Sequence, residues 1–284
     1  MRRHLIVPFL MGQRRHGLCR VAELDGRDWE VLDDAGFTDT SIADANEKMR
    51  RMGVIYAGLA ARVAQVARAG QVPVSIAGDC MSSLGVLAGL QRAGREPQRI
   101  LWLDAHGDFH TWGTTQTQYL GGMPLAILVG RGDRRQAERD AVGAFVGALG
   151  LRPYPEHRIV LSDARDLDPG EAEAIGASAI VTCGIDAVLR HLTPGESLYL
   201  HWDTDVVNAE ADMPALKYHV KRGPGRADMR TLFQSLRGVD IVAVSVSAWH
   251  AERDGDNQTA LACLALLGEL DAAGGGARRR GGTP

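Results

Sequence analysis

The chain alternates short apolar runs with longer segments in which apolar residues recur every three or four positions. Continuous apolar runs of about four to eight residues are typical of strands covered on both faces, whereas the longer spacing is typical of amphipathic helices. The runs predict strands at 4–10, 73–77, 99–103, 158–162, 179–182, 197–202 and 240–246. The helical spacing predicts helices at 44–70, 82–94, 124–130, 136–149, 171–176, 186–191, 228–236 and 258–271.

This alternation predicts one α/β domain over residues 1–271, with a mostly parallel central sheet and helices on both faces. Residues 272–284 (AAGGGARRRGGTP) are Gly- and Arg-rich and are expected to be disordered, although three arginines could also bind phosphate. The apolar run near the N-terminus could belong to a short signal peptide. No small-residue cleavage site follows it, so a first strand is expected there.

The composition excludes several classes of protein. The 284 residues are 45% hydrophobic and 24% charged, with a net charge of −3, which is typical of a globular domain with a sizeable core. No basic face indicates a nucleic-acid partner, and no segment approaches the roughly 18 apolar residues of a membrane helix. The four cysteines are far apart and form no CxxC pair. We therefore expect reduced thiols, a cytoplasmic location and a small-molecule ligand.

Residues able to bind metal follow three of the predicted strands. Cys80 follows the strand at 73–77, Asp104-Ala105-His106-Gly107-Asp108 follows 99–103, and Asp203-Thr204-Asp205 follows 197–202. Residues two apart in extended chain point to the same side, and ligands of open parallel sheets bind at the carboxyl ends of strands. The pattern therefore gathers one thiol, one imidazole and four carboxylates: Cys80, Asp104, His106, Asp108, Asp203 and Asp205.

Four unpaired carboxylates cannot crowd together without raising one another's pKa. Two divalent cations would offset this charge, and ions roughly 3.5–4 Å apart can also deprotonate one bridging water. Each motif alone is compatible with a polar turn, but their joint position at strand ends favours a dinuclear metal site. Cys80 could instead be a small buried residue beside a weakly held or missing ion.

These motifs resemble those of the arginase–agmatinase family of ureohydrolases. Ala77-Gly78-Asp79-Cys80 is similar to the family's Gly-Gly-Asp-His, with Cys80 in the place of the histidine, and the two aspartate motifs match in full. Further similar segments are 120–124, 165–169 and 252–260. The resemblance covers nearly the whole chain. It implies a single arginase-like three-layer α/β sandwich with two Mn²⁺ ions.

The resemblance also implies roles for individual residues. Asp104 and Asp203 would bridge the metals, with Cys80 and Asp108 completing one site and His106 and Asp205 the other. A bridging hydroxide would attack the guanidino carbon, and Asp108 would pass its proton to the departing amine. In the substrate pocket, Asp168 would bind the α-amino group, and Thr117 and His110 the α-carboxylate. For these three loop residues a purely solvated role stays open.

Three departures from the family's pattern bear on the substrate. Cys80 is a softer and charged ligand, so it weakens its metal as a Lewis acid. Gly121 stands where arginases hold a proton-shuttle histidine, and Ala243 or Ala248, depending on the alignment, replaces a glutamate that faces the guanidinium. An arginine guanidinium (pKa above about 12) stays protonated, so its burial requires a partner charge. The chain therefore favours a less basic guanidine.

Such a substrate is N-omega-hydroxy-L-arginine, cleaved to L-ornithine and hydroxyurea. The cysteine ligand and the absent shuttle resemble the hydroxyarginine hydrolases that supply hydroxyurea for D-cycloserine biosynthesis. Two alternatives stay open: an arginase-, agmatinase- or guanidinobutyrase-type enzyme, and a metal-degraded homologue without activity. The chain ends in a Gly/Arg segment without large apolar residues, which is compatible with a monomer, and a homo-oligomer is not excluded.

Overall fold

The centre of the molecule is a parallel eight-stranded sheet with the order β4-β1-β5-β10-β9-β6-β7-β8. The computed structural model describes residues 1–33, 39–132, 136–208, 213–236 and 238–274. The strands of the main sheet are β1 (Arg2–Val7), β4 (Trp29–Val31), β5 (Val72–Ala77), β6 (Arg99–Leu103), β7 (Ile159–Ser162), β8 (Val181–Cys183), β9 (Ser197–Asp203) and β10 (Asp240–Ser247). β2 (Phe9–Leu10) and β3 (Gln13–Arg14) form a separate antiparallel pair.

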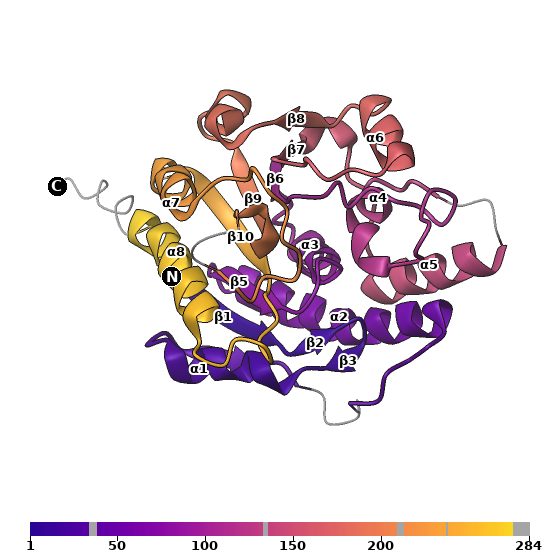
Figure 1. Ribbon diagram of the computed structural model, residues 1–284, viewed down its shortest axis with the longest axis horizontal. Helices are drawn as coiled ribbons and strands as arrows, with labels where there is room; N and C mark the ends of the chain where they lie inside the picture. The colour runs from indigo at the N-terminus through magenta and orange to yellow at the C-terminus, as the bar shows by residue number, and fades with distance from the viewer. Residues whose placement is uncertain (34–38, 133–135, 209–212, 237, 275–284) are drawn as a thin grey trace.

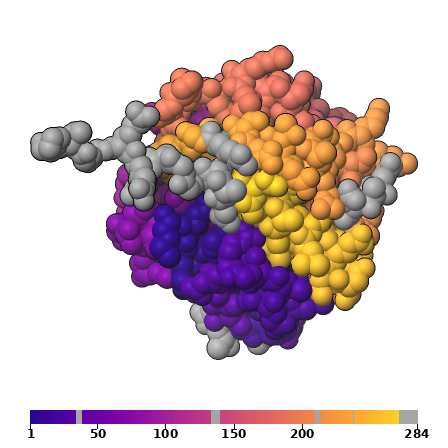
Figure 2. Space-filling view, turned by 90° about the vertical axis from the view of Figure 1, so that its left-hand side faces the viewer, coloured from indigo at the N-terminus to yellow at the C-terminus, as the bar shows by residue number. Residues whose placement is uncertain are grey.

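Helices cover both faces of this sheet, which confirms the predicted α/β class and its three layers (Figure 1). The apolar residues of α2 (Ala45–Arg68), α3 (Ser82–Arg92), α4 (Pro124–Leu128) and α5 (Gln136–Leu149) share one core with one face, and α6 (Pro169–Gly176) packs at its border. On the other face lie α1 (Val21–Leu24), α7 (Arg226–Ser235) and α8 (Gln258–Gly274). Figure 2 shows α8 lying between the N-terminal elements and α7.

The packing of α2 against α3 fixes the start of α3, and with it Cys80. The side chain of Asp44 caps α2 by accepting a hydrogen bond from the backbone of Glu47. A Cβ atom at Gly85 would lie 2.8 Å from the Tyr56 carbonyl oxygen, and one at Gly89 2.6 Å from that of Ala60. The two glycines therefore allow a backbone approach that no larger residue permits.

Several predicted boundaries are wrong for local reasons. The strand expected at 4–10 is interrupted at Pro8, which has no N–H to donate to a ladder, so β1 ends at Val7 and β2 begins at Phe9. The short edge strand β4 carries no apolar run and was not predicted. The segment Ile185–His191 is a 3₁₀ turn, and α8 continues past residue 271 to Gly274. Residues 275–284 lie outside the described residues, so the predicted tail is not tested.

No helix within the described ranges is long and apolar enough to cross a bilayer.

Candidate metal centre

Two neighbouring strands deliver aspartates to the same edge of the sheet through the same local turn. β6 and β9 pair in parallel with Leu103 opposite Trp202, so Asp104 and Asp203 leave the sheet side by side. Oδ1 of Asp104 accepts a hydrogen bond from the backbone N–H of His106 at 2.8 Å, and Oδ1 of Asp203 one from Asp205 at 3.0 Å. The predicted convergence is therefore found, but turns rather than extended chain produce it.

Cys80 reaches the same edge from β5. Asp79, buried beside it, accepts hydrogen bonds from the Met11 backbone N–H at 2.7 Å and from the Tyr56 hydroxyl at 2.6 Å. These bonds hold the turn that aims the Cys80 side chain at β9. The Cys80 thiol lies 2.8 Å from Oδ2 of Asp203 and donates to it.

The third aspartate of the β6 motif has an unusual backbone. Asp108 has a φ of 50°, a left-handed conformation that non-glycine residues rarely adopt. Its carbonyl oxygen accepts hydrogen bonds from the N–H groups of Leu125 and Ala126, at the start of α4. A Cβ atom at Gly107 would lie 2.6 Å from Glu171. The start of α4 and the packing of α6 therefore impose the strained turn that directs Asp108 inward.

Potential metal-binding atoms form two groups that share Asp104. One donor atom each of Cys80, Asp104, Asp108 and His201 lie within 4.8 Å of one another, and so do those of Asp104, His106 and Asp205. Asp203 joins the groups through its contact with Cys80. Within these two groups, three buried atoms have no hydrogen-bond partner among the described residues: Oδ2 of Asp108, Oδ1 of Asp205 and Nε2 of His201. This donor set, with open lone pairs on buried atoms, fits two divalent cations.

The protonation equilibria show how much negative charge is concentrated there. Burial, followed by the neighbouring carboxylates, raises the pKa of Cys80 and that of Asp108, and it raises the pKa of Asp205 to about 7. Burial disfavours the charged form of His106, but hydrogen bonds to Asp104 and Asp205 outweigh it and raise its pKa to about 12. Protons thus compensate the charge, and bound cations would take over that role and lower these pKa values.

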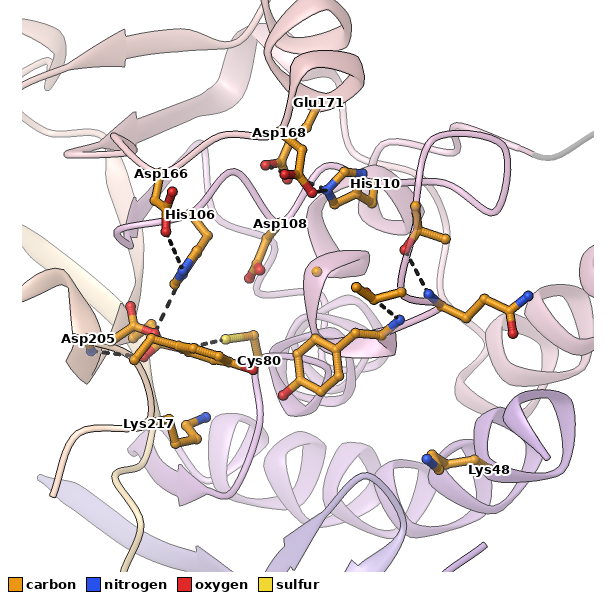
Figure 3. A pocket seen from close by; sticks show the side chains of 18 residues that line it. Lys48, Cys80, His106, Asp108, His110, Asp166, Asp168, Glu171, Asp205 and Lys217 are labelled. Carbon is orange, nitrogen blue, oxygen red and sulfur yellow. Dashed lines mark hydrogen bonds and ion pairs between the residues drawn. The ribbon is translucent and has the colours of Figure 1, made fainter. Parts of the chain in front are cut away.

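A cavity of about 610 Å³ opens above the donor groups, which form its floor: Cys80, Asp104, His106, Asp108, Asp203 and Asp205 (Figure 3). Its rim includes the three predicted substrate-binding residues, His110, Thr117 and Asp168. Nε2 of His110 lies 3.2 Å from Oδ2 of Asp168, and Nδ1 lies 3.1 Å from Oγ1 of Thr114. Thr117 Oγ1 accepts a hydrogen bond from the Tyr119 backbone at 3.3 Å. The rim therefore offers an acceptor, an imidazole and a hydroxyl to one ligand.

A lysine that the sequence did not single out also lines this cavity. Lys217 Nζ donates to the Gly78 carbonyl oxygen and to Oγ of Ser247, each at 2.9 Å. Burial lowers the pKa of an ammonium group, but Asp203, Cys80 and Asp205 outweigh it and raise the pKa of Lys217. Lys217 is therefore a fixed cation beside the donor cluster.

The structure also shows where Ala243 and Ala248 lie, the two positions aligned with the glutamate of arginases. Ala243 and Ala248 are both buried, Ala243 in the middle of β10 opposite Tyr199, and neither lines the cavity. The β10 residue level with Asp203 is Ser247, which bonds to Lys217. Neither alanine reaches the cavity with its short side chain, and the described part of β10 places no carboxylate there.

Gly121 stands where arginases hold the proton-shuttle histidine, and the ring of Tyr119 fills the space above it. A Cβ atom at Gly121 would clash with the ring of Tyr119. Tyr119 also lies edge-on to Tyr218, with ring centroids 6.4 Å apart, and both line the cavity. An aromatic wall thus stands at this point, and sequence reasoning did not predict it.

Of the residues missed from sequence, only His201 had a usable signal. It lies two positions before Asp203 on β9, so the alternation used for the aspartates also places it on Asp203's side of the sheet. Lys217 lies outside every helix and strand. Arg165 holds that part of the chain by donating to the carbonyl oxygens of Val206, Val220 and Lys221, contacts that no local pattern predicts.

The parallel sheet and the donor groups at its carboxyl edge define an α/β protein with a candidate dinuclear metal centre. Among solved structures, it is similar to the arginase of Bacillus subtilis (TM-score 0.79, 22% identity, 95% of this chain and 98% of that chain). It is also similar to the agmatine ureohydrolase of Thermoplasma volcanium (TM-score 0.64, 16% identity, 96% and 89%). At these identities the likeness shows the fold.

The sequence comparisons go further. The family model described as Arginase family matches residues 16–271. The arginase of Bacillus caldovelox is 30% identical over 243 residues, which cover 81% of this chain and 75% of that protein. The N(omega)-hydroxy-L-arginine amidinohydrolase of Streptomyces lavendulae is 29% identical over 170 residues, 55% of this chain and 53% of that protein. The chain belongs to the arginase family, whose members are hydrolases that act on guanidino groups and typically depend on two metal ions.

Proposed function

We propose that the chain is a cytoplasmic dinuclear-metal hydrolase that cleaves N-omega-hydroxy-L-arginine to L-ornithine and hydroxyurea. The observation that carries this choice is Lys217, a cation beside the proposed metal ligands. The likeness to the hydroxyarginine amidinohydrolase of Streptomyces lavendulae supports it. We further propose that the released hydroxyurea supplies D-cycloserine biosynthesis.

The proposed ligands leave little negative charge for a cationic substrate. Asp104, Asp108, Asp203, Asp205 and a Cys80 thiolate carry five negative charges, and two divalent ions leave one of them unbalanced. Lys217 cancels that charge. A guanidinium that stays protonated at neutral pH would then meet a metal centre that has no net attraction for it, and its burial there would be unfavourable. A hydroxyguanidine is less basic because its oxygen withdraws electrons, so it loses its proton on entering the site at a lower free-energy cost.

The residues divide into a reacting floor and a binding rim. Bound divalent cations would supply a polarised water as the nucleophile. We propose Mn²⁺ for the oxygen-rich group of His106 and Asp205. Asp108, whose Oδ2 is buried and unpartnered among the described residues, receives a proton from the attacking water and passes it to the departing amine. Asp168 binds the α-amino group, and His110 and Thr117 bind the α-carboxylate.

The test compares three substrates under identical metal loading. Metal-free enzyme is reconstituted with excess Mn²⁺ and incubated with arginine, agmatine or hydroxyarginine. Ornithine, agmatine-derived putrescine, urea and hydroxyurea are then quantified. We expect the highest kcat/KM for hydroxyarginine, with equimolar ornithine and hydroxyurea. A higher kcat/KM for arginine would overturn the proposed substrate and leave the hydrolase assignment intact.

Arginase activity is the second candidate, because the arginase of Bacillus caldovelox matches a larger share of the chain than the hydroxyarginine hydrolase does. Both candidates predict ornithine from an α-amino acid, so the second product, urea or hydroxyurea, and the ratio of kcat/KM values separate them. Fewer than about one ion per chain after reconstitution, with no turnover of any guanidine, would instead indicate a metal-degraded homologue.

A further inference from the structure

A buried histidine lies under the proposed metal site and belongs to none of its motifs. His201, on β9, is fully buried, and its ring lies against Trp102 with centroids 3.9 Å apart. One of its ring nitrogens lies within 4.8 Å of Sγ of Cys80 and of carboxylate oxygens of Asp104 and Asp108. His201 therefore belongs to the same cluster of potential donor atoms as these three residues.

The surroundings of His201 orient one nitrogen and leave the other open. Nδ1 lies 2.7 Å from Oγ of Ser245, which in turn lies 2.5 Å from the Tyr199 hydroxyl. Nε2 is buried and has no hydrogen-bond partner among the described residues. A metal-binding histidine typically has this arrangement, because a hydrogen bond at one nitrogen fixes the ring and directs the lone pair of the other toward the ion.

We propose that His201 is a ligand of the metal ion held by Cys80 and Asp108. This inference rests on the proposed metal site and extends it. With Asp104 and Asp203, that ion then has one sulfur, one nitrogen and three carboxylate donors. The sulfur and nitrogen donors suit Zn²⁺, Fe²⁺ or Co²⁺ better than Mn²⁺. The group of His106 and Asp205 has one nitrogen and otherwise carboxylate donors, which suits Mn²⁺. The two sites therefore select different metals.

The experiment uses Co²⁺, because its spectra identify the ligands without substrate. A thiolate-to-cobalt charge-transfer band reports a cysteine ligand, and hyperfine coupling to nitrogen reports a histidine ligand. Metal-free enzyme labelled with ¹⁵N-histidine receives one equivalent of Co²⁺. We expect a thiolate charge-transfer band in the near ultraviolet and coupling to one histidine nitrogen. In His201→Ala the band is retained and the nitrogen coupling is lost. The affinity for this first equivalent falls at least about tenfold.

His4→Ala is the matched control, since His4 is also a buried histidine against a tryptophan, Trp29, with centroids 4.9 Å apart. It should retain both signals and the wild-type affinity, and Cys80→Ser should lose the thiolate band. Nitrogen coupling that persists in His201→Ala, or an unchanged affinity, would overturn the inference. So would a wild-type first equivalent without thiolate charge transfer. Because no substrate is present, the preference for hydroxyarginine is tested separately.

The wild-type spectra also cover the case in which His201→Ala does not fold. Addition of a second equivalent of Co²⁺ to the wild type should add coupling to the nitrogen of His106, giving two histidine nitrogens in all. A total of one would contradict ligation by His201 without any variant.

Discussion

The floor and the rim of the cavity are built in opposite ways. On the floor, Cys80, Asp104 and Asp205 follow strands or their turns and are at most 5% exposed. On the rim, the side chains of Asp166 and Asp168 are 67% and 57% exposed and belong to connecting segments. The floor is thus fixed by strand register, whereas the rim is held by backbone hydrogen bonds between loops, such as that from the Asp166 N–H to the Ala105 carbonyl oxygen.

The difference assigns separate tasks to the two regions. Asp104 and Asp203 follow paired positions on β6 and β9, so the sheet fixes where they lie, as a reaction centre requires. An exposed rim can change its side chains without disturbing the sheet, so we expect the amino-acid end of the substrate to be recognised there. Lys217 is the exception, because a loop residue contributes charge to the floor.

The largest effect is expected from a floor residue shared by both donor groups. Asp104→Asn removes the charge of the carboxylate that lies in both groups. We expect kcat/KM to fall at least about 100-fold, with a loss of bound metal measured by elemental analysis. Asp163→Asn is the matched control, because Asp163 follows the adjacent strand β7 and lies in neither group. Equal losses in both variants would contradict a specific role for Asp104.

A rim aspartate should affect binding and leave the metals in place. Asp168→Asn removes the charge proposed to bind the α-ammonium group. We expect about a tenfold fall in kcat/KM, mainly through KM, because a charge-assisted hydrogen bond at an exposed site is lost. Glu173→Gln, an exposed acid on α6 outside the cavity lining, should leave KM unchanged. A drop in metal content would instead place Asp168 with the floor.

The sequence predicts the floor better than the rim because the floor depends on local patterns and the rim on contacts between distant segments. An apolar run followed by Asp-Ala-His-Gly-Asp indicates a covered strand and its ligand-bearing end, and β6 ends at Leu103 as expected. The turns of Asp104 and Asp203 are local and need only a neighbouring N–H. Lys217 and Tyr119 acquire their positions from distant segments, through Gly78, Ser247 and Tyr218, and no local pattern specifies such contacts.

Lys217 allows the charge of the floor to be changed from a loop. Lys217→Gln keeps a hydrogen-bond donor for Ser247 and removes the cation. We expect the ratio of kcat/KM for arginine to that for hydroxyarginine to rise about fivefold, equivalent to roughly 1 kcal/mol. A ratio is insensitive to the folded fraction of the variant, since both substrates meet the same enzyme.

Lys48→Gln is the control for that charge, because Lys48 also lines the cavity but comes from α2, on the other side of the view from Lys217 (Figure 3). It should leave the ratio unchanged. If the two variants shifted the ratio equally, the general charge of the cavity rather than the position of Lys217 would determine selectivity.

The smallest expected effect concerns the aromatic wall. Gly121→Ala introduces a Cβ atom that clashes with the ring of Tyr119 and displaces it, so kcat/KM for hydroxyarginine should fall about threefold, or roughly 0.6 kcal/mol. In a Tyr119→Ala background the ring is absent, and adding Gly121→Ala should cost nothing further. The interaction energy of this double-mutant cycle therefore equals the cost of the clash. Additive effects would mean that Gly121 acts through its backbone and that the tyrosine ring does not form the wall above it.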